Sequence, residues 1–90
     1  MKVIFSHGKE SGPWGSKIKT LAGIAKAHGF DVDSIDYRGT DNPDDRALIL
    51  EEYLSKETQA YILVGSSMGG YVSLVAASKY SPRGLFLLAP

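Results

Sequence analysis

Short apolar runs and helical spacings alternate strictly along this chain, and this alternation restricts the possible folds more than any other feature. The apolar runs predict buried strands over residues 3–5, 32–37, 60–64 and 84–89. Between them, apolar side chains recur at helical spacing over residues 16–28, after Pro43, and over residues 68–80. Four strands separated by three helices predict an α/β fold, a three-layer sandwich with a parallel sheet covered on both faces.

Local signals support these boundaries. Gly29 follows the first helix at a position that favours glycine, and Asn42-Pro43 can cap and begin the second helix. Right-handed crossovers then place the second strand outside the first, with the third and fourth strands on the other side. Ligand chemistry is expected at the carboxyl ends of the strands, near the switch point between the first and third strands.

Composition excludes several classes of protein. A chain of 90 residues with 43% hydrophobic and 22% charged residues predicts one small globular domain. The formal net charge of +0 argues against binding of nucleic acid or an anionic membrane through bulk charge. Without cysteine there can be no disulfide scaffold, thiol nucleophile or thiolate metal site. The apolar start is too short for a signal peptide, so we expect a cytoplasmic protein with no membrane span.

The strongest chemical signal is Gly65-Ser66-Ser67-Met68-Gly69, which fits the pattern G-x-S-x-G with Ser67 at its centre. The motif lies between a predicted strand and a predicted helix. There a serine on a sharp turn would expose its hydroxyl above the sheet, and flanking glycines would avoid steric collisions. The helix N-terminus would also favour negative charge on a reaction intermediate. Alternatively, the segment is a glycine-rich turn with an idle serine.

A second signal, Ser6-His7-Gly8, follows the first strand. A loop at this place can supply the Lys9 backbone N–H to an oxyanion hole, together with the N–H of Met68. His7 itself is at least as well explained as a turn residue whose ring binds the backbone and supports the loop. Two weaker features also remain open: Trp14 could line an acyl pocket or anchor the first helix, and Asp36-Tyr37-Arg38-Gly39 is best explained as a plain turn.

Together these segments resemble the α/β-hydrolase family, and most of all its small, lidless bacterial serine esterases. Ser6-His7-Gly8 is similar to the family's oxyanion loop, Asp36-Tyr37-Arg38-Gly39 to its Asp-x-Arg-Gly turn, and Gly65–Gly69 to its nucleophile elbow. The resemblance implies a serine hydrolase without a cofactor or a metal. Ser67 would be the catalytic nucleophile, Lys9 and Met68 the oxyanion donors, and His7, Gly8, Gly65 and Gly69 supporting residues.

The family's acid and base are missing from the expected places. They follow the elbow's helix in the chain, yet no Asp, Glu or His lies between Met68 and Pro90. The resemblance therefore implies about half of a hydrolase domain over residues 1–90, whose isolated chain would be inactive or weakly active. A non-catalytic α/β module for binding or assembly is the alternative.

Possible partners follow from the same features. We expect a small-molecule ester or related acyl substrate, and neither nucleic acid nor a membrane. The last predicted strand is apolar on both faces and ends the chain with an uncovered edge. It predicts a homodimer or association with a missing C-terminal half.

Overall fold

The computed structural model describes residues 1–88 and contains four strands and three helices in strict alternation. In chain order they are β1 (Lys2–Ser6), α1 (Ser16–Ala27), β2 (Asp31–Ile35), α2 (Pro43–Ser55), β3 (Tyr61–Ser66), α3 (Met68–Ala77) and β4 (Gly84–Leu88). The predicted elements are all present. Their bounds agree to within three residues, and Ala89, which the sequence places in the last strand, lies outside the described residues.

The four strands form one parallel sheet in the order β2-β1-β3-β4, which confirms the topology predicted from the sequence. The register aligns the carboxyl ends of the strands: Ser6 of β1 pairs with Ile35 of β2 and with Gly65 of β3. The loops after β1 and β3 therefore leave the sheet side by side.

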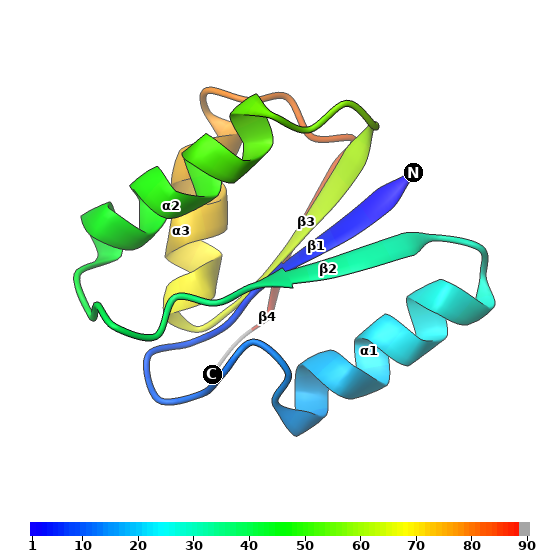
Figure 1. Ribbon diagram of the computed structural model, residues 1–90, viewed down its shortest axis with the longest axis horizontal. Coiled ribbons are helices and arrows are strands. Elements are labelled where there is room, and N and C mark those ends of the chain that lie inside the picture. Colours follow the sequence, from blue (N-terminus) through cyan, green and yellow to red (C-terminus); the bar gives the residue numbers. More distant parts are fainter. Residues whose placement is uncertain (89–90) are drawn as a thin grey trace.

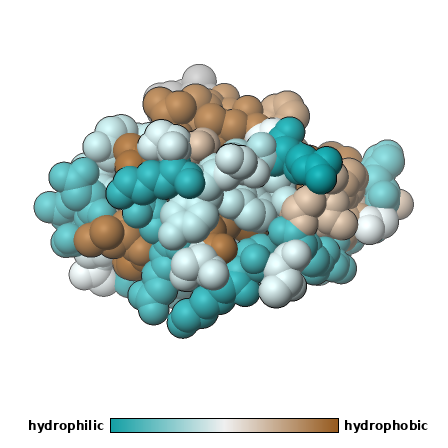
Figure 2. Space-filling model, turned by 90° about the horizontal axis from the view of Figure 1, so that it is seen from above, coloured by the Kyte–Doolittle hydropathy of each residue, from teal (hydrophilic) through white to brown (hydrophobic). Residues whose placement is uncertain are grey.

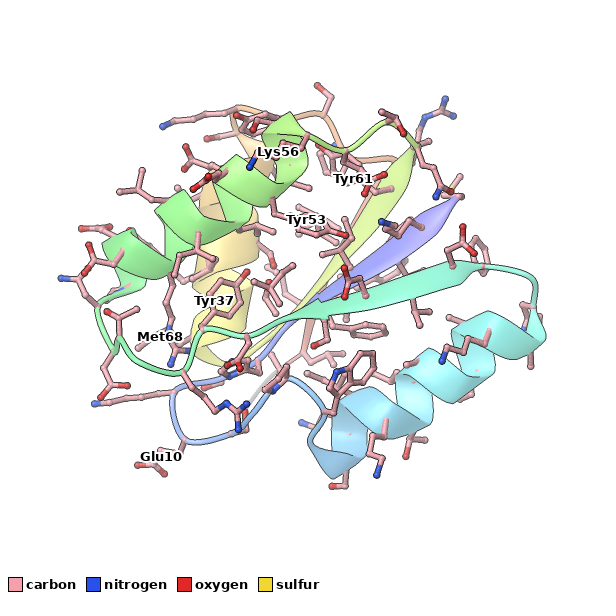
Figure 3. The ribbon with its side chains drawn as sticks, viewed as in Figure 1. Glu10, Tyr37, Tyr53, Lys56, Tyr61 and Met68 are labelled. Atoms are coloured by element: carbon pink, nitrogen blue, oxygen red, sulfur yellow. The ribbon has the colours of Figure 1, made fainter. Side chains whose placement is uncertain are left out.

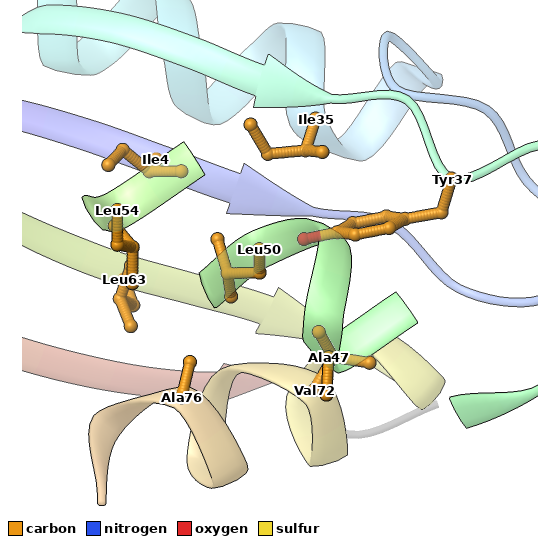
Figure 4. Close-up of a cluster of buried hydrophobic side chains, with 9 residues drawn as sticks. All are labelled: Ile4, Ile35, Tyr37, Ala47, Leu50, Leu54, Leu63, Val72 and Ala76. Atoms are coloured by element: carbon orange, nitrogen blue, oxygen red, sulfur yellow. The ribbon is translucent and has the colours of Figure 1, made fainter. Parts of the chain in front are cut away.

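Helices cover both faces of the sheet (Figure 1). The face under α2 and α3 is the better packed one, and its core comprises Ile4, Ile35, Tyr37, Ala47, Leu50, Leu54, Leu63, Val72 and Ala76 (Figure 4). The opposite face has only α1, which buries a smaller cluster of Val3, Phe5, Ile18 and Ala22. Alternate strand residues therefore enter two different cores, as expected for strands buried on both faces.

The start of α2 is fixed by its cap. The Asn42 side chain accepts hydrogen bonds from the backbone N–H groups of Asp44 and Asp45, and Pro43 occupies the first turn. This cap was predicted from the sequence, and it sets the point at which the chain leaves the carboxyl end of the sheet and turns back along it.

The side of the sheet around β4 is only partly covered. Phe86 and Leu87 are 58% and 51% exposed although they belong to a strand with an unbroken apolar sequence. A groove of about 420 Å³ runs between α1 and this part of the sheet, lined by side chains that include Phe5, Ile24, Phe30 and Phe86. In Figure 2 the largest apolar patch of that view lies along its upper edge. β4 is an edge strand of the described sheet, at the opposite edge from β2, as the sequence predicts.

Candidate functional site

Ser67 is the residue that connects β3 to α3, and its backbone is strained. Its φ of 55° and ψ of −121° make it the only non-glycine residue with a positive φ among residues 1–88. Such a conformation normally requires glycine and costs about 1–3 kcal/mol for other residues. A residue other than glycine keeps this conformation only when the surrounding structure holds it there. The close packing allowed by Gly65 and Gly69 holds Ser67 in this way.

Gly65 and Gly69 let the elements around Ser67 approach more closely than any side chain would permit. A Cβ atom on Gly69 would lie 2.0 Å from the Ser6 carbonyl oxygen, at the end of β1. A Cβ atom on Gly65 would lie 2.3 Å from the Gly69 carbonyl oxygen. Because these contacts are to backbone atoms, they cannot be relieved by rotating a side chain. The two glycines therefore bring the first turn of α3 against the ends of β1 and β3.

The loop after β1 passes directly beside Ser67. A Cβ atom on Gly8 would lie 3.1 Å from Ser67 Cβ and 3.6 Å from Ser67 Oγ. Among residues 1–88, no acceptor is found for the backbone N–H of Lys9 or of Met68. Figure 3 shows Met68 at the end of the molecule to which the strand arrows point. The loop that carries Lys9, the serine and the helix N-terminus therefore meet at one place.

His7 is fully buried and uses both ring nitrogens in contacts with the backbone. Its Nε2 accepts a hydrogen bond of 2.9 Å from the Tyr37 N–H, so Nδ1 carries the proton and donates to the Gly8 carbonyl oxygen at 2.7 Å. Burial lowers the pKa of His7 below its usual value, which favours the neutral ring. In this arrangement the ring ties the loop after β1 to the end of β2 and has no nitrogen left for Ser67.

Arg46, in the first turns of α2, is a buried cation that the sequence analysis did not identify as part of the site. Its side chain is 1% exposed. Nε donates to the Thr40 carbonyl oxygen at 2.7 Å, and Nη1 donates to the Gly8 carbonyl oxygen at 3.1 Å. The sequence offered little signal for this, because an arginine next to Asp44 and Asp45 near a helix start usually faces solvent.

The Asp36–Arg38 turn after β2 pairs with itself, as we expected of a plain turn. Arg38 donates two side-chain hydrogen bonds to the Asp36 carboxylate, at 2.9 and 2.8 Å. These bonds from Arg38 hold the pKa of the Asp36 carboxyl well below its usual range. Asp36 Oδ1 is also 4.0 Å from His7 Nε2, although that nitrogen is already engaged by the Tyr37 N–H.

Neither histidine is placed to accept a proton from Ser67. His28 follows α1, and the hydrogen bond from the Asp31 N–H to the Met1 carbonyl oxygen places this region at the amino end of the sheet, opposite Ser67.

No group of three or more His, Cys, Asp or Glu side chains able to hold a metal ion occurs in residues 1–88. None of the helices in this part of the chain is long and apolar enough to cross a bilayer.

A small hollow of about 190 Å³ lies at the same end of the sheet. It is bordered by Ser66, by the first residues of α1 and by the loop before them, including Ser11 and Gly12. Trp14, for which we left open a place in an acyl pocket, is 45% exposed and does not line this hollow.

Comparison with known proteins agrees with this fold. A crystal structure from Xanthomonas campestris pv. campestris, described as that of a candidate hydrolase of the alpha/beta superfamily, superimposes with a TM-score of 0.86 at 28% identity. The match covers 99% of this chain but only 58% of that protein. A phosphotransferase system component EIIA from Streptococcus agalactiae matches with a TM-score of 0.55 at 18% identity over 98% of this chain and 66% of its own, and shows a likeness of fold alone.

At the level of sequence, no curated protein matches the chain significantly. A family model described as "Uncharacterised protein family (UPF0227)" matches residues 2–90. The chain therefore belongs to the family UPF0227, and its fold is related to that of the α/β-hydrolase superfamily.

Proposed function

We propose that this chain carries the nucleophile and the oxyanion hole of a serine hydrolase with esterase-like activity, and that Ser67 is the nucleophile. The observation that carries the proposal is the strained backbone of Ser67 between β3 and α3, with no room for a side chain at Gly65 or Gly69. A serine held at this cost on a strand-to-helix turn exposes its hydroxyl at the carboxyl end of the sheet, as nucleophilic serines of α/β hydrolases require.

The proposed reaction is acyl transfer in two steps. Ser67 Oγ attacks the ester carbonyl carbon and gives up its proton to a base, and the resulting oxyanion accepts hydrogen bonds from the Lys9 and Met68 N–H groups. The intermediate then collapses, the ester C–O bond breaks, and the alcohol leaves with the proton. Water attacks the acyl-enzyme in the same way, which releases the carboxylic acid and restores the Ser67 hydroxyl.

The base and its orienting acid have no candidates at the site among residues 1–88, since both ring nitrogens of His7 are occupied and His28 lies at the far end of the sheet. We assign them to residues outside this part of the chain, either in a longer chain or in a partner. The substrate class is a small-molecule ester. The open hollow of about 190 Å³ beside Ser66 offers space for a short acyl group.

The test is hydrolysis of p-nitrophenyl acetate, together with labelling by a fluorophosphonate, in the complete protein that contains these residues. Ser67→Ala should lower kcat by about 10⁴-fold or more and abolish labelling, because only oxyanion and binding contributions remain. Ser66→Ala is the matched control, because Ser66 has the same side chain as Ser67 but does not have a glycine two residues away on each side. Equal losses in both variants would show that Ser67 has been misassigned.

The isolated 90-residue chain should react slowly with the same fluorophosphonate. Because both ring nitrogens of His7 are engaged with the backbone, no imidazole is free to accept the Ser67 proton, so the hydroxyl stays protonated near neutral pH and is a poor nucleophile. Rapid stoichiometric labelling of the isolated chain at Ser67 would contradict this and would indicate a base within these residues.

We also propose that the exposed edge of β4 is covered in the functional protein, by a second copy or by further chain. Phe86 and Leu87 leave apolar surface on both sides of that strand. Sedimentation of the 90-residue chain at low micromolar concentration should show association. A cooperatively folded monomer of 9.7 kDa would contradict this proposal.

A further inference from the structure

The guanidinium of Arg46 is buried without a close acidic partner. The nearest carboxylate oxygen, Asp41 Oδ1, lies 3.7 Å from Nη2, and the Asp41 side chain is 68% exposed. Most contacts of the guanidinium are instead to backbone carbonyl oxygens, and it lies 5.6 Å from the centre of the Tyr37 ring. A cation removed from water without a good counter-ion is costly to the fold, so its carbonyl partners indicate what it does.

Those partners are on two loops at the carboxyl end of the sheet. Nε binds the Thr40 carbonyl oxygen at 2.7 Å, whereas Nη1 binds the Gly8 carbonyl oxygen at 3.1 Å and approaches that of His7 at 3.5 Å. The Gly8 carbonyl oxygen also accepts the hydrogen bond from His7 Nδ1 at 2.7 Å. Two strong donors therefore converge on this one carbonyl oxygen.

The orientation of that carbonyl determines the orientation of the Lys9 N–H. Both belong to the same peptide unit, which is planar and trans, because residues 1–88 contain no cis peptide bond. In a trans peptide the C=O and N–H bonds point in opposite directions. When Arg46 and His7 hold the Gly8 oxygen on their side, the Lys9 N–H must point away from them.

We propose that Arg46 is a positioning residue for the oxyanion hole. It acts from inside α2 by fixing the Gly8–Lys9 peptide so that the Lys9 N–H is available beside Ser67. The short distance from the Gly8 Cβ position to Ser67 Oγ, 3.6 Å, places this peptide next to the proposed nucleophile. The inference deepens the proposed hydrolase function and depends on it for its catalytic consequence, but the peptide orientation can be tested separately.

The first experiment measures kcat and KM of the complete protein with p-nitrophenyl acetate. Arg46→Met should lower kcat by at least about 10-fold with KM nearly unchanged, because loss of an oxyanion donor affects the transition state more than the bound ester. Arg46→Lys should recover only part of kcat, since one ammonium group cannot span both the Thr40 and Gly8 carbonyl oxygens.

Asn42→Ala is the matched control. It removes the cap of the same helix, four residues earlier, and so destabilises α2 without touching the Gly8 carbonyl. Its kcat should equal that of the unmodified protein. If Asn42→Ala lowers kcat as much as Arg46→Met does, or if Arg46→Met changes only KM, Arg46 is a structural residue and the inference is wrong.

The second experiment does not need activity. In isotope-labelled protein, Arg46→Met should shift the Gly8 carbonyl ¹³C and the Lys9 amide ¹⁵N resonances, whereas Asn42→Ala should leave them in place. Unchanged resonances in Arg46→Met would overturn the inference, whatever the kinetics. If Ser67→Ala keeps full activity while these resonances shift in Arg46→Met, the proposed function fails but the positioning of the peptide stands.

Discussion

Replacing Gly69 with alanine is the sharpest test of how the serine turn is built. The new Cβ atom would lie 2.0 Å from the Ser6 carbonyl oxygen, 2.5 Å from the Ser6 carbonyl carbon and 2.9 Å from the His7 carbonyl oxygen. Ordinary van der Waals contact begins near 3.4 Å, so α3 and the end of β1 must separate by about 1.4 Å. The obstructing atoms are backbone atoms of a central strand with neighbours on both sides.

We therefore expect Gly69→Ala to lower the free energy of unfolding by about 3 kcal/mol, near the upper end of the usual range for overpacking. In a domain of this size, that loss lowers Tm by about 12–24 °C, measured by circular dichroism. Gly23→Ala is the control, because a Cβ atom on Gly23, on the exposed side of α1, meets no atom within 4 Å. Alanine there should raise stability by about 1 kcal/mol through helix propensity. The close packing we describe is refuted if Gly69→Ala melts within about 4 °C of the unmodified chain.

Three other substitutions give expected outcomes that equilibrium unfolding in urea can check. Ser67→Gly should stabilise the fold by about 1–2 kcal/mol while removing the nucleophile, because glycine adopts this φ without strain. The control Ser66→Gly, in β3, should not stabilise the fold. Destabilisation by Ser67→Gly would contradict the backbone strain that we describe at Ser67. Ser73→Ala should stabilise by about 1 kcal/mol, because the buried Ser73 hydroxyl has no partner among residues 1–88, whereas Ser78→Ala loses a hydrogen bond to the Val75 carbonyl and should show no gain. His7→Gln should remove part of the loss of stability that occurs as the pH falls below about 6.5. Because the pKa of His7 is lowered in the folded state, the unfolded chain binds this proton first as the pH falls. Acid therefore favours unfolding, by at most about 1.4 kcal/mol per pH unit for this one group. An identical pH profile for the variant would count against a buried neutral ring.

The strand order could be predicted from the sequence because it depends on features that are local and periodic. Four apolar runs, three helical spacings and the rule of right-handed crossovers leave few arrangements, and the observed strand order is the one predicted from them. The expected position of Ser67 at the end of β3 follows from the same alternation, since the motif falls between a strand and a helix.

The surroundings of the serine could not be predicted in the same way. Arg46 contacts Gly8, which lies 38 positions earlier in the chain, and no spacing rule connects a helix residue to a loop carbonyl at that separation. The partners of the His7 ring, the Tyr37 N–H and the Gly8 carbonyl, also exist only once β2 lies beside β1. Tertiary contacts of this kind decide whether a polar residue is buried and bonded or exposed.

The apolar sequence of β4 shows the opposite limit. An unbroken run of apolar residues indicates a strand covered on both faces. In the structure of residues 1–88, however, Phe86 and Leu87 are more than half exposed to solvent. The apolar pattern is typical of a strand covered on both faces, and the described residues do not supply that cover. An apolar pattern can therefore predict the burial of a strand face that the described residues leave exposed.

The Ser67 N–H donates a hydrogen bond of 3.3 Å to the carbonyl oxygen of Leu88, at the end of the least covered strand. Local opening of β4 would therefore break a contact of the serine backbone, although Ser67 follows a strand that is paired on both sides. The amide of Ser67 should then exchange its hydrogen with solvent at the rate of the outer strand and not at the slower rate of β1. A partner of the kind proposed for β4 would slow this opening, and it would thereby also lengthen the time that Ser67 spends in its strained conformation.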